Sequence, residues 1–432
     1  MRKRLRPDSL LRASTYVLIG NAAGAIMGFA VLAILARSLE PASFGVLAAL
    51  TTIIDIGIVV IDAILFAGVV IVASRYAISD PVRSDMALKL GLLIRLPLVI
   101  GTALVGILAA GPVSQGLTGS PEWAAEVRVV FLVLPLLAIQ GYIISTMQAR
   151  QAFGRLAVTT LYKNFFRLGA VSVLLIVGTL SVTSAVWAFL VAAALALGFS
   201  LVGAPRSYLA RPGFGDGVLG EIFQVNKWMA IAALGLLGAR VDIVMLSRLA
   251  PFAETGYYAA ALQLCLMVSL VSSALVTTLL PRTAQLATGD EMRRHFRRCL
   301  PFLPLGLLGL LPVLAVSGWA VPLALGANFG AAVTPFNLLM ASAILTLVTN
   351  PILLLVFPMN LVPAYAMMTL VQLVLRVAAN WYVMPAHGAA GAAAVDLGVK
   401  LLTIGIAIVV LWMMLRRRNG PAGSALPVGE QG

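Results

Sequence analysis

Two cations stand one helical turn apart in a stretch of the chain that is otherwise apolar. Lys163 and Arg167 lie in the run 156–177, which is long enough to cross a membrane. A cation at the centre of a membrane helix costs about 2.5–3.5 kcal/mol on insertion scales, so it needs a polar interior or a partner. Residues four apart share a helix face, and like charges there repel each other. An anion between them would relieve this repulsion, and a guanidinium beside an ammonium suits phosphate oxygens.

Other charged residues also fall inside apolar stretches. Six cations and four acids share this setting, so the acids cannot neutralise every cation one for one. Most of the cations must therefore line a solvated cavity or find a partner, and for Lys163 and Arg167 an acid or a backbone carbonyl is the alternative to an anion. The cations, which we predict to bind substrate, are Lys163, Arg167, Arg376, Arg240, Lys400 and Arg95. The acids, which we predict to couple to ions or to neutralise cations, are Asp55, Asp62, Asp242 and Asp396.

The spacing of two cations relative to nearby acids separates their expected roles. Lys400 follows Asp396 by four residues, so the two can neutralise each other on one helix face. This pairing and a cavity role for Lys400 are equally well supported. Arg240 and Asp242 are two residues apart and point to different faces, so they cannot cancel within their helix. Asp242 is then expected to pair with a neighbouring span, which leaves Arg240 free to line a cavity.

The remaining intramembrane charges lie in the second and third apolar runs. Asp55 and Asp62 are seven residues apart and share a helix face. A role as partner for Arg240 is favoured over a site that responds to protons or sodium ions. Arg95 lies about a third of the way into its span and can extend toward the cytoplasmic headgroups. It therefore ranks below the other cations as a substrate ligand.

These charges belong to a chain with the composition of a membrane protein. Of its 432 residues 61% are hydrophobic and 11% charged, and the mean hydropathy is +1.02, whereas soluble domains are about 45–50% apolar. Apolar runs of about 20 residues predict an all-α integral membrane protein with twelve transmembrane helices. The expected spans are 16–36, 44–66, 88–110, 127–149, 156–178, 182–202, 226–246, 256–280, 301–321, 332–357, 364–384 and 389–415.

The net charge of +14 reflects topology rather than nucleic-acid binding. Lys and Arg gather at both termini and in the loops after even-numbered spans, whereas the opposite loops hold just Arg37 and Arg248. This positive-inside pattern predicts two cytoplasmic termini. The predicted parts are a cytoplasmic N-terminus (1–15), a six-helix N-lobe (16–203), a cytoplasmic linker (204–220), a six-helix C-lobe (221–415) and a disordered cytoplasmic tail (416–432).

The two halves of the sequence resemble each other. Residues 35–45 align with residues 246–256, and a nearly identical shift places Arg167 on Arg376. Two parallel repeats that both begin inside are related by an axis along the membrane normal, and such folds bind substrate between the halves. We therefore expect two pseudo-symmetric lobes, with Arg167 and Arg376 facing each other across the interface. The cavity should be most basic on the first-half side, with Lys163 nearer its cytoplasmic entrance.

Motifs in both halves are similar to those of a known transporter family. Residues 36–45, ARSLEPASFG, resemble the Arg-x-Leu-Gly-Pro-x-x-Phe-Gly turn of the oligosaccharide flippases, the polysaccharide-transporter branch of the multidrug/oligosaccharidyl-lipid/polysaccharide exporter superfamily. Glu40 stands where that family usually has Gly. Residues 241–260, followed by Leu-Pro-Arg at 280–282, are similar to the second-half signature of the family. Residues 380–394 resemble its Asn followed by Gly-x-x-Gly-Ala-Ala.

The resemblance implies a two-lobed, twelve-helix transporter of the bacterial inner membrane that is not an enzyme. Its substrate would be undecaprenyl-pyrophosphate-linked oligosaccharide, moved from the cytoplasmic to the periplasmic leaflet by alternating access for O-antigen, capsule or exopolysaccharide synthesis. The partners implied are this polyprenyl-pyrophosphate-linked oligosaccharide, the lipid bilayer, a polysaccharide polymerase and other assembly proteins. No cofactor and no nucleic acid is expected.

Two other functions remain open. A multidrug or cation antiporter of the same superfamily requires an acid-dominated cavity, whereas bases outnumber acids here. A membrane glycosyltransferase or polymerase requires a sizeable polar loop with catalytic residues, and the longest predicted outside loop, 111–126, offers just Glu122 and Glu126. The sequence contains no Walker motif, catalytic triad or metal-binding motif, and Cys265 and Cys299 lack zinc-site spacing.

Overall fold

The computed structural model describes residues 7–77, 79–205, 209, 217–235, 237–286, 288–359 and 361–417. Within these residues all regular structure is helical and no strand occurs. Parts of three predicted segments lie outside the described residues, namely 1–6 of the N-terminus, 206–208 and 210–216 of the linker, and 418–432 of the tail. The described part of the predicted N-terminus, from Pro7, belongs to the first helix.

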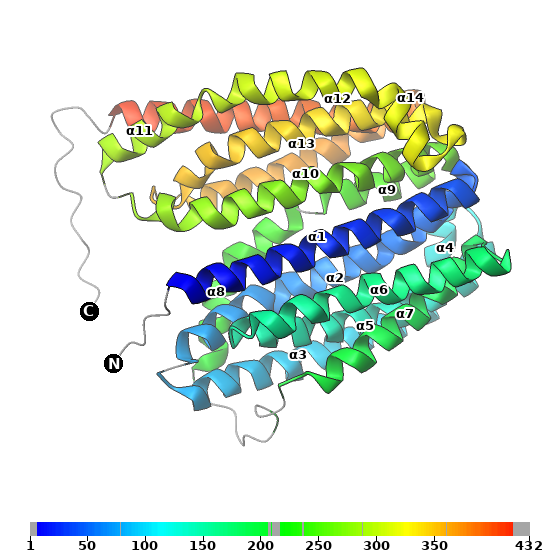
Figure 1. The fold of residues 1–432 in the computed structure, drawn as a ribbon, viewed down its shortest axis with the longest axis horizontal. Helices are drawn as coiled ribbons and strands as arrows, with labels where there is room; N and C mark the ends of the chain where they lie inside the picture. The colour runs from blue at the N-terminus through cyan, green and yellow to red at the C-terminus, as the bar shows by residue number, and fades with distance from the viewer. Residues whose placement is uncertain are drawn as a thin grey trace.

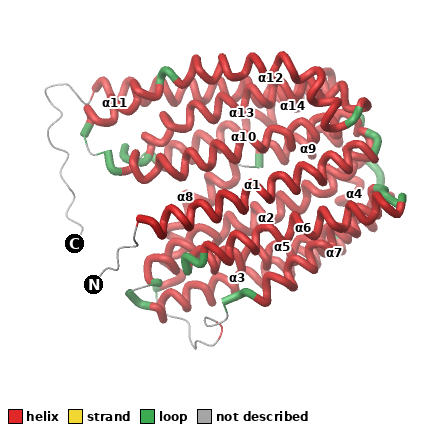
Figure 2. The backbone as a smooth tube through the Cα atoms, in the orientation of Figure 1, coloured by secondary structure: helices red, strands yellow, loops and turns green. Residues whose placement is uncertain are grey.

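The helices of the first half of the chain lie side by side, and those of the second half lie next to them (Figures 1 and 2). In the first half the elements are α1 (Pro7–Ser38), α2 (Pro41–Tyr76), α3 (Pro81–Leu108), α4 (Ala110–Thr118), η1 (Pro121–Trp123), α5 (Ala124–Ala149), α6 (Phe153–Val177) and α7 (Val182–Val202). In the second half they are α8 (Val218–Gly235), α9 (Gly238–Leu249), α10 (Phe252–Ala284), α11 (Gly289–Cys299), α12 (Phe302–Leu325), η3 (Ala327–Ala332), α13 (Val333–Leu353), η4 (Leu354–Val356) and α14 (Val362–Arg417).

Local sequence signals explain where several helices begin and end. Pro41 and Pro81 occupy the first positions of α2 and α3, where the missing N–H is not needed and the fixed φ suits a helix. Ser181 and Ser184 form a reciprocal capping box at the start of α7. Gly178 follows α6 with φ of 74°, a left-handed conformation that costs glycine little. These signals set the short turn that places α6 antiparallel to α7.

Ten helical segments of the described chain are long and apolar enough to cross a membrane. The described helices differ from the expected spans in two places. The region expected as span 226–246 is divided into α8 and the short α9, neither of which is among the ten. The last two expected spans lie in one element, α14, in which Gly388 adopts φ of 52° and ψ of −135° and so interrupts the helical backbone.

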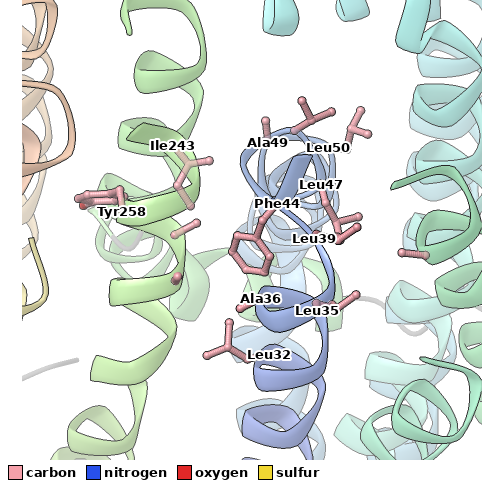
Figure 3. Packing of buried hydrophobic residues seen from close by; sticks show 14 of the residues in the cluster. Leu32, Leu35, Ala36, Leu39, Phe44, Leu47, Ala49, Leu50, Ile243 and Tyr258 are labelled. Atoms are coloured by element: carbon pink, nitrogen blue, oxygen red, sulfur yellow. The ribbon is translucent and has the colours of Figure 1, made fainter. Parts of the chain in front are cut away.

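The largest apolar core lies where α1 and α2 meet α9 and α10. Leu35 of α1, Leu47 and Leu50 of α2 and Ile243 of α9 are buried there, and Figure 3 shows their side chains together. Tyr258 of α10 is fully buried in the same cluster. Because this core includes residues from both halves of the sequence, packing joins the halves directly.

Two glycines allow the starts of α2 and α10 to cross at backbone contact. A methyl group added at Gly45 would overlap the carbonyl oxygen of Phe252, and one added at Gly256 would overlap that of Pro41. Both glycines occupy equivalent positions in the internal repeat. The repeat therefore has a structural consequence, since each half contributes the small residue that the other half needs.

A second connection between the halves runs along α2 and α8. Asn226 donates its side-chain amide to Ala63 O at 2.6 Å and accepts a hydrogen bond from Gly68 N at 3.1 Å. At the end of α2, Arg75 pairs with Glu221 of α8 at 2.6 Å. These contacts hold α8 against α2.

Candidate functional site

A cavity of about 550 Å³ lies between the two halves of the chain. In the first half its walls come from α1, α2, α5, α6 and α7, and in the second half from α9 and α10. One part of its wall is the apolar core around Leu35 and Leu47. Small residues on α1, including Gly24 and Gly28, leave room along one side. The volume falls in the range of about 300–1,000 Å³ that is typical of ligand sites.

Four charged side chains of the described residues line this cavity. Lys163 and Arg167 come from α6, Arg240 from α9 and Asp55 from α2. Asp55 Oδ2 lies 3.2 Å from Arg240 Nη2, which is an ion pair between the two halves. The favoured interpretation of Asp55, as a partner for Arg240, agrees with this geometry. With three cations and one anion the lining carries a net charge of +2, so the site attracts anions.

Lys163 and Arg167 both lack an ion-pair partner within 4.0 Å among the described residues. Lys163 has an exposed side chain, which lines the cavity. Arg167 stacks its guanidinium on the ring of Phe189, 3.8 Å from the ring centroid, and its buried Nε has no hydrogen-bond partner in the described structure. Asp55 attracts both cations across the cavity, but does not pair with either. Their hydrogen-bonding capacity is thus available to a ligand.

The position of α6 is fixed by its contact with α1. Asn164 donates its side-chain amide to Gly24 O at 3.0 Å, and Gly20 packs against Ala157. Because Lys163 directly precedes Asn164, this anchor sets the rotation of α6 that turns the cations toward the cavity. The arrangement orients the two charges before any ligand binds, which lowers the entropic cost of binding.

Uncharged polar side chains complete the lining. Asn21 and Thr51 come from the first half, and Gln263 and Ser269 come from α10 in the second half. The donors and acceptors of these groups can bind hydroxyl groups of a ligand. Among the described residues, no group of three or more His, Cys, Asp and Glu side chains is placed to hold a metal ion.

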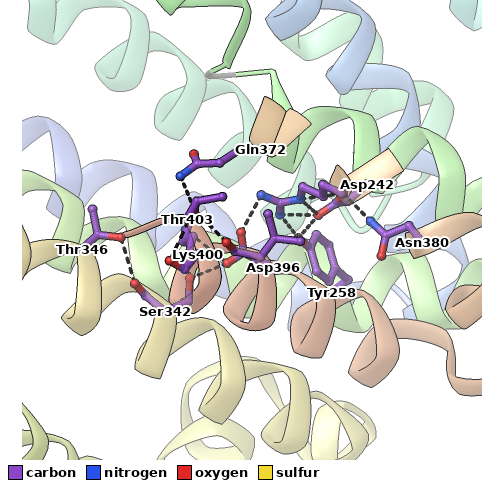
Figure 4. A network of polar contacts seen from close by, with 11 residues as sticks. Asp242, Tyr258, Ser342, Thr346, Gln372, Asn380, Asp396, Lys400 and Thr403 are labelled. Atoms are coloured by element: carbon purple, nitrogen blue, oxygen red, sulfur yellow. Dashed lines mark hydrogen bonds and ion pairs between the residues drawn. The ribbon is translucent and has the colours of Figure 1, made fainter. Parts of the chain in front are cut away.

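Figure 4 shows a polar network within the second half of the chain that includes Asp242, Tyr258 and Asp396. Arg376, expected opposite Arg167, lies buried in this network. Its Nε is 2.9 and 2.8 Å from the two carboxylate oxygens of Asp242, and its Nη2 also contacts this carboxylate. Tyr258 donates to Asp242 Oδ2 at 2.6 Å, and Asn380 donates to Oδ1 at 2.8 Å. Arg376 does not line the cavity, because it forms an ion pair with Asp242 of the neighbouring helix α9.

The other side of this network is organised by Asp396. Arg376 Nη1 lies 2.5 Å from Asp396 Oδ1 as an ion pair without hydrogen-bond geometry. Lys400 Nζ lies 3.1 Å from Asp396 Oδ2, and Ser342 donates to the same oxygen at 2.5 Å. Of the two arrangements expected for Lys400, the structure shows the pair with Asp396. Lys400 is absent from the cavity lining. Two acids and two cations make the network neutral, and they connect α9, α13 and both parts of α14.

Arg95 also lies away from the cavity. Its Nη2 is 2.6 Å from Asp62 Oδ1, and its side chain is buried between α2, α3 and α5, with Tyr142 nearby. Its place in the sequence had suggested that the side chain extends toward the headgroups, whereas the structure shows it buried and paired with Asp62. Arg95, Arg376 and Lys400, which we predicted to bind substrate, therefore lie in internal ion pairs and outside the cavity lining.

Some residues of the cavity were missed by reasoning from the sequence. Asn21 and Gln263 interrupt apolar runs, and this signal could have identified them. Phe189 carries no such signal, because its stacking on Arg167 depends on how α7 packs beside α6. Outside the cavity, Tyr258 and Asn380 both donate hydrogen bonds to the buried Asp242 carboxylate.

Comparison with known proteins identifies relatives along almost the whole chain. Lipid III flippase of Escherichia coli (strain K12) is 26% identical over 425 residues, which covers 94% of this chain and 97% of the relative. Lipid III flippase of Shigella flexneri matches with the same identity and coverage.

Several solved transporter structures share the fold. An inward-facing multidrug resistance MATE family transporter of the MOP superfamily matches with a TM-score of 0.76 at 13% identity, covering 92% of this chain and 96% of that chain. An outward-facing multidrug resistance MATE family transporter of the MOP superfamily matches with a TM-score of 0.61 at 14% identity, covering 94% of both chains. Lipid II flippase MurJ in an inward closed conformation has a TM-score of 0.69 at 10% identity, covering 92% of this chain and 87% of that chain.

A family match supplements these similarities. Residues 10–287 match the family described as "Polysaccharide biosynthesis protein", and this match extends over more than half of the sequence. It includes most of α1 and all of α2 to α10, and therefore every charged residue of the described chain that lines the cavity. The chain accordingly belongs to the polysaccharide biosynthesis protein family.

Proposed function

We propose that this protein is a flippase for lipid-linked oligosaccharides. It moves undecaprenyl-pyrophosphate-linked glycan from the cytoplasmic to the periplasmic leaflet of the bacterial inner membrane, in the synthesis of surface polysaccharide. The observation that carries the proposal is the cavity between the two halves, in which Lys163 and Arg167 have no ion-pair partner among the described residues. Family membership and the lipid III flippase relatives support the same substrate class.

The proposed substrate fits the chemistry of the cavity. Lys163 and Arg167 bind the diphosphate, because an ammonium and a planar guanidinium on one helix face complement its oxygens. The glycan occupies the space lined by Asn21, Thr51 and Gln263, whose side chains bind sugar hydroxyls. The polyprenyl tail stays in the bilayer outside the cavity, so the cavity encloses the diphosphate and the glycan alone.

Transport proceeds by alternating access between two six-helix lobes with both termini in the cytoplasm. The ten candidate spans, the interruption of α14 at Gly388 and the α8–α9 pair support twelve crossings in total. The fold is closer to the inward-facing than to the outward-facing MATE structure, which supports a cavity open to the cytoplasm. The linker at 204–220 then joins the lobes on the cytoplasmic side, and rocking of the lobes re-exposes the site outside.

Coupling to an ion gradient or to the membrane potential is the proposed energy source. All four candidate acids are paired, Asp55 with Arg240, Asp62 with Arg95, and both Asp242 and Asp396 with Arg376. Asp55 is the acid that faces the cavity. Flipping in sealed proteoliposomes should respond to a proton, sodium or voltage gradient, and indifference to all three would refute the coupling.

A cation antiporter of the same superfamily is the second candidate, and the MATE structures favour it at the level of the fold. The charges of the cavity oppose it, since three cations face one acid. A cationic drug would be repelled by the side chains that attract a diphosphate. Drug efflux by the reconstituted protein in the absence of lipid-glycan binding would reverse this preference.

The test of the flippase is removal of the unpaired cations. The double variant Lys163→Gln/Arg167→Gln should lose surface polysaccharide while retaining normal protein levels in the membrane. Arg155→Gln is the matched control, because Arg155 lies on the same helix, is exposed and is absent from the cavity lining. Normal polysaccharide in the double variant would refute the anion site.

A further inference from the structure

We propose that Asp55 sets the number of negative charges that the cavity accepts. By this means the site selects a diphosphate that is esterified at both ends over a diphosphate with a free terminal phosphate. In substrate terms, the site prefers the lipid carrier loaded with glycan over the unloaded carrier. The inference rests on the proposed function, because it assigns a role to another residue of the same site.

The lining of the cavity has a net positive charge. Among the described residues the charged side chains at the cavity are Lys163, Arg167, Arg240 and Asp55. Three positive charges and one negative charge leave a net charge of +2. Without Asp55 the same cavity would carry +3, so this single carboxylate decides which ligand charge the site matches.

The location of Asp55 gives its charge an effect on the whole site. Asp55 lies 3.2 Å from Arg240, and its side chain is 43% exposed to the cavity. It also attracts Lys163 and Arg167 electrostatically, so it lies within the field of all three cations. The ion pair keeps Asp55 on the α9 side and leaves the α6 cations available. A ligand held by the α6 cations therefore meets Asp55 across the cavity.

The other acids of the membrane region do not share this position. Asp62 pairs with Arg95 at 2.6 Å between α2 and α3. Asp242 and Asp396 lie in the neutral network around Arg376, where they are 0% and 3% exposed. None of the three lines the cavity. Within the described part of the chain, Asp55 is thus the carboxylate whose charge an incoming ligand encounters.

The two forms of the lipid carrier differ in charge. A diphosphate joined at both ends keeps one ionised oxygen on each phosphate, as a phosphodiester does, and this charge balances the lining. A free terminal phosphate ionises a second time with a pKa of about 6, so the unloaded carrier has most of an extra negative charge at neutral pH. This extra negative charge exceeds the net positive charge of the lining, and Asp55 repels it.

Binding to two short-chain ligands tests this role. The probes are farnesyl diphosphate and farnesyl diphosphate carrying one N-acetylglucosamine, titrated into the full-length protein in lipid nanodiscs. The measured quantity is the ratio of the two dissociation constants, which cancels tail contacts common to both ligands. In Asp55→Asn the affinity for farnesyl diphosphate should rise relative to that for the glycosylated ligand by about tenfold, because one repulsive charge is removed.

Three further variants make the result specific. Asp55→Glu keeps the charge and should keep the wild-type ratio. Asp55→Ser is a second neutral variant, which repeats the test if Asp55→Asn fails to fold. Glu122→Gln removes a negative charge from an exposed position outside the cavity, so it should leave the ratio unchanged.

The outcomes separate this inference from the proposed function. If the wild type binds the glycosylated ligand and the neutral Asp55 variants keep its ratio, the role of Asp55 is refuted while the flippase proposal stands. If the wild type binds neither ligand, the proposed function fails, and the inference with it. A similar shift in Glu122→Gln would also overturn the inference, because the effect would then reflect total charge.

Discussion

Replacing Arg376 by Gln should destabilise the protein strongly, because this cation holds two buried carboxylates. Asp242 is 0% exposed and Asp396 is 3% exposed, and both lie within ion-pair distance of Arg376. The network is neutral in the wild type and would have a net charge of −1 in Arg376→Gln. Breaking a buried ion pair by removing one partner costs about 3–5 kcal/mol, since the remaining charge is left uncompensated.

A second substitution should recover part of this loss. In Arg376→Gln/Asp242→Asn the network is neutral again, because Asp396 still pairs with Lys400. We expect the second change to restore at least about 1 kcal/mol, within the range of measured couplings between contacting residues. By contrast, Asp242→Asn alone should be destabilising, since it leaves Arg376 with Asp396 as its one remaining carboxylate in the network.

Thermal unfolding of the purified variants in detergent, followed together with surface polysaccharide in cells, provides the assay. We expect a lower melting temperature in Arg376→Gln and partial recovery in the double variant. If Arg376 instead contacted substrate across the interface, polysaccharide would be lost at an unchanged melting temperature. Wild-type stability in Arg376→Gln, or no recovery in the double variant, would refute the structural role.

Two further predictions concern the helix crossing and the cavity wall. Gly256→Ala places a methyl group against the backbone of Pro41, so it should cost about 1–3 kcal/mol and lower the melting temperature, whereas Gly309→Ala on α12, with open space around it, should have little effect. Equal melting temperatures would contradict the close crossing. Phe189→Leu removes the ring beneath Arg167 and should weaken binding of the glycosylated diphosphate severalfold, since such a contact is worth about 0.5–2 kcal/mol. Phe189→Tyr should retain binding, and equal affinity of the Leu variant would exclude a role for the ring.

Much of the architecture was predictable from the sequence because membrane insertion constrains local composition. A bilayer requires about 20 apolar residues for each crossing, so spans such as those in α6 and α7 can be identified one at a time. Proline and serine signals near α2, α3 and α7 also act locally. The division of one expected span into α8 and α9 was not predictable, because the run from Asn226 to Leu246 is continuously apolar enough to suggest one helix.

The site was predicted in part, and the reason lies in the range of the interactions. Lys163 and Arg167 were identifiable because their spacing along one helix makes mutual neutralisation impossible. Lys400 and Asp396 could be paired for the opposite reason, since unlike charges at the same spacing attract. In both cases the deciding contact lies within one helix.

Pairing between helices depends on the tertiary structure alone. The repeat aligned Arg376 with Arg167, but α9 brings Asp242 to Arg376, whereas α6 receives no acid within ion-pair distance among the described residues. Arg240 and Arg95 likewise find Asp55 and Asp62 on α2. The sequence by itself determined that charged side chains lie within membrane-spanning segments and must be neutralised or solvated there. Tertiary packing decided which charges neutralise each other and which two cations face the cavity without an acid partner among the described residues, because a desolvated ion is stabilised by the neighbours within a few ångströms, whatever their separation along the chain.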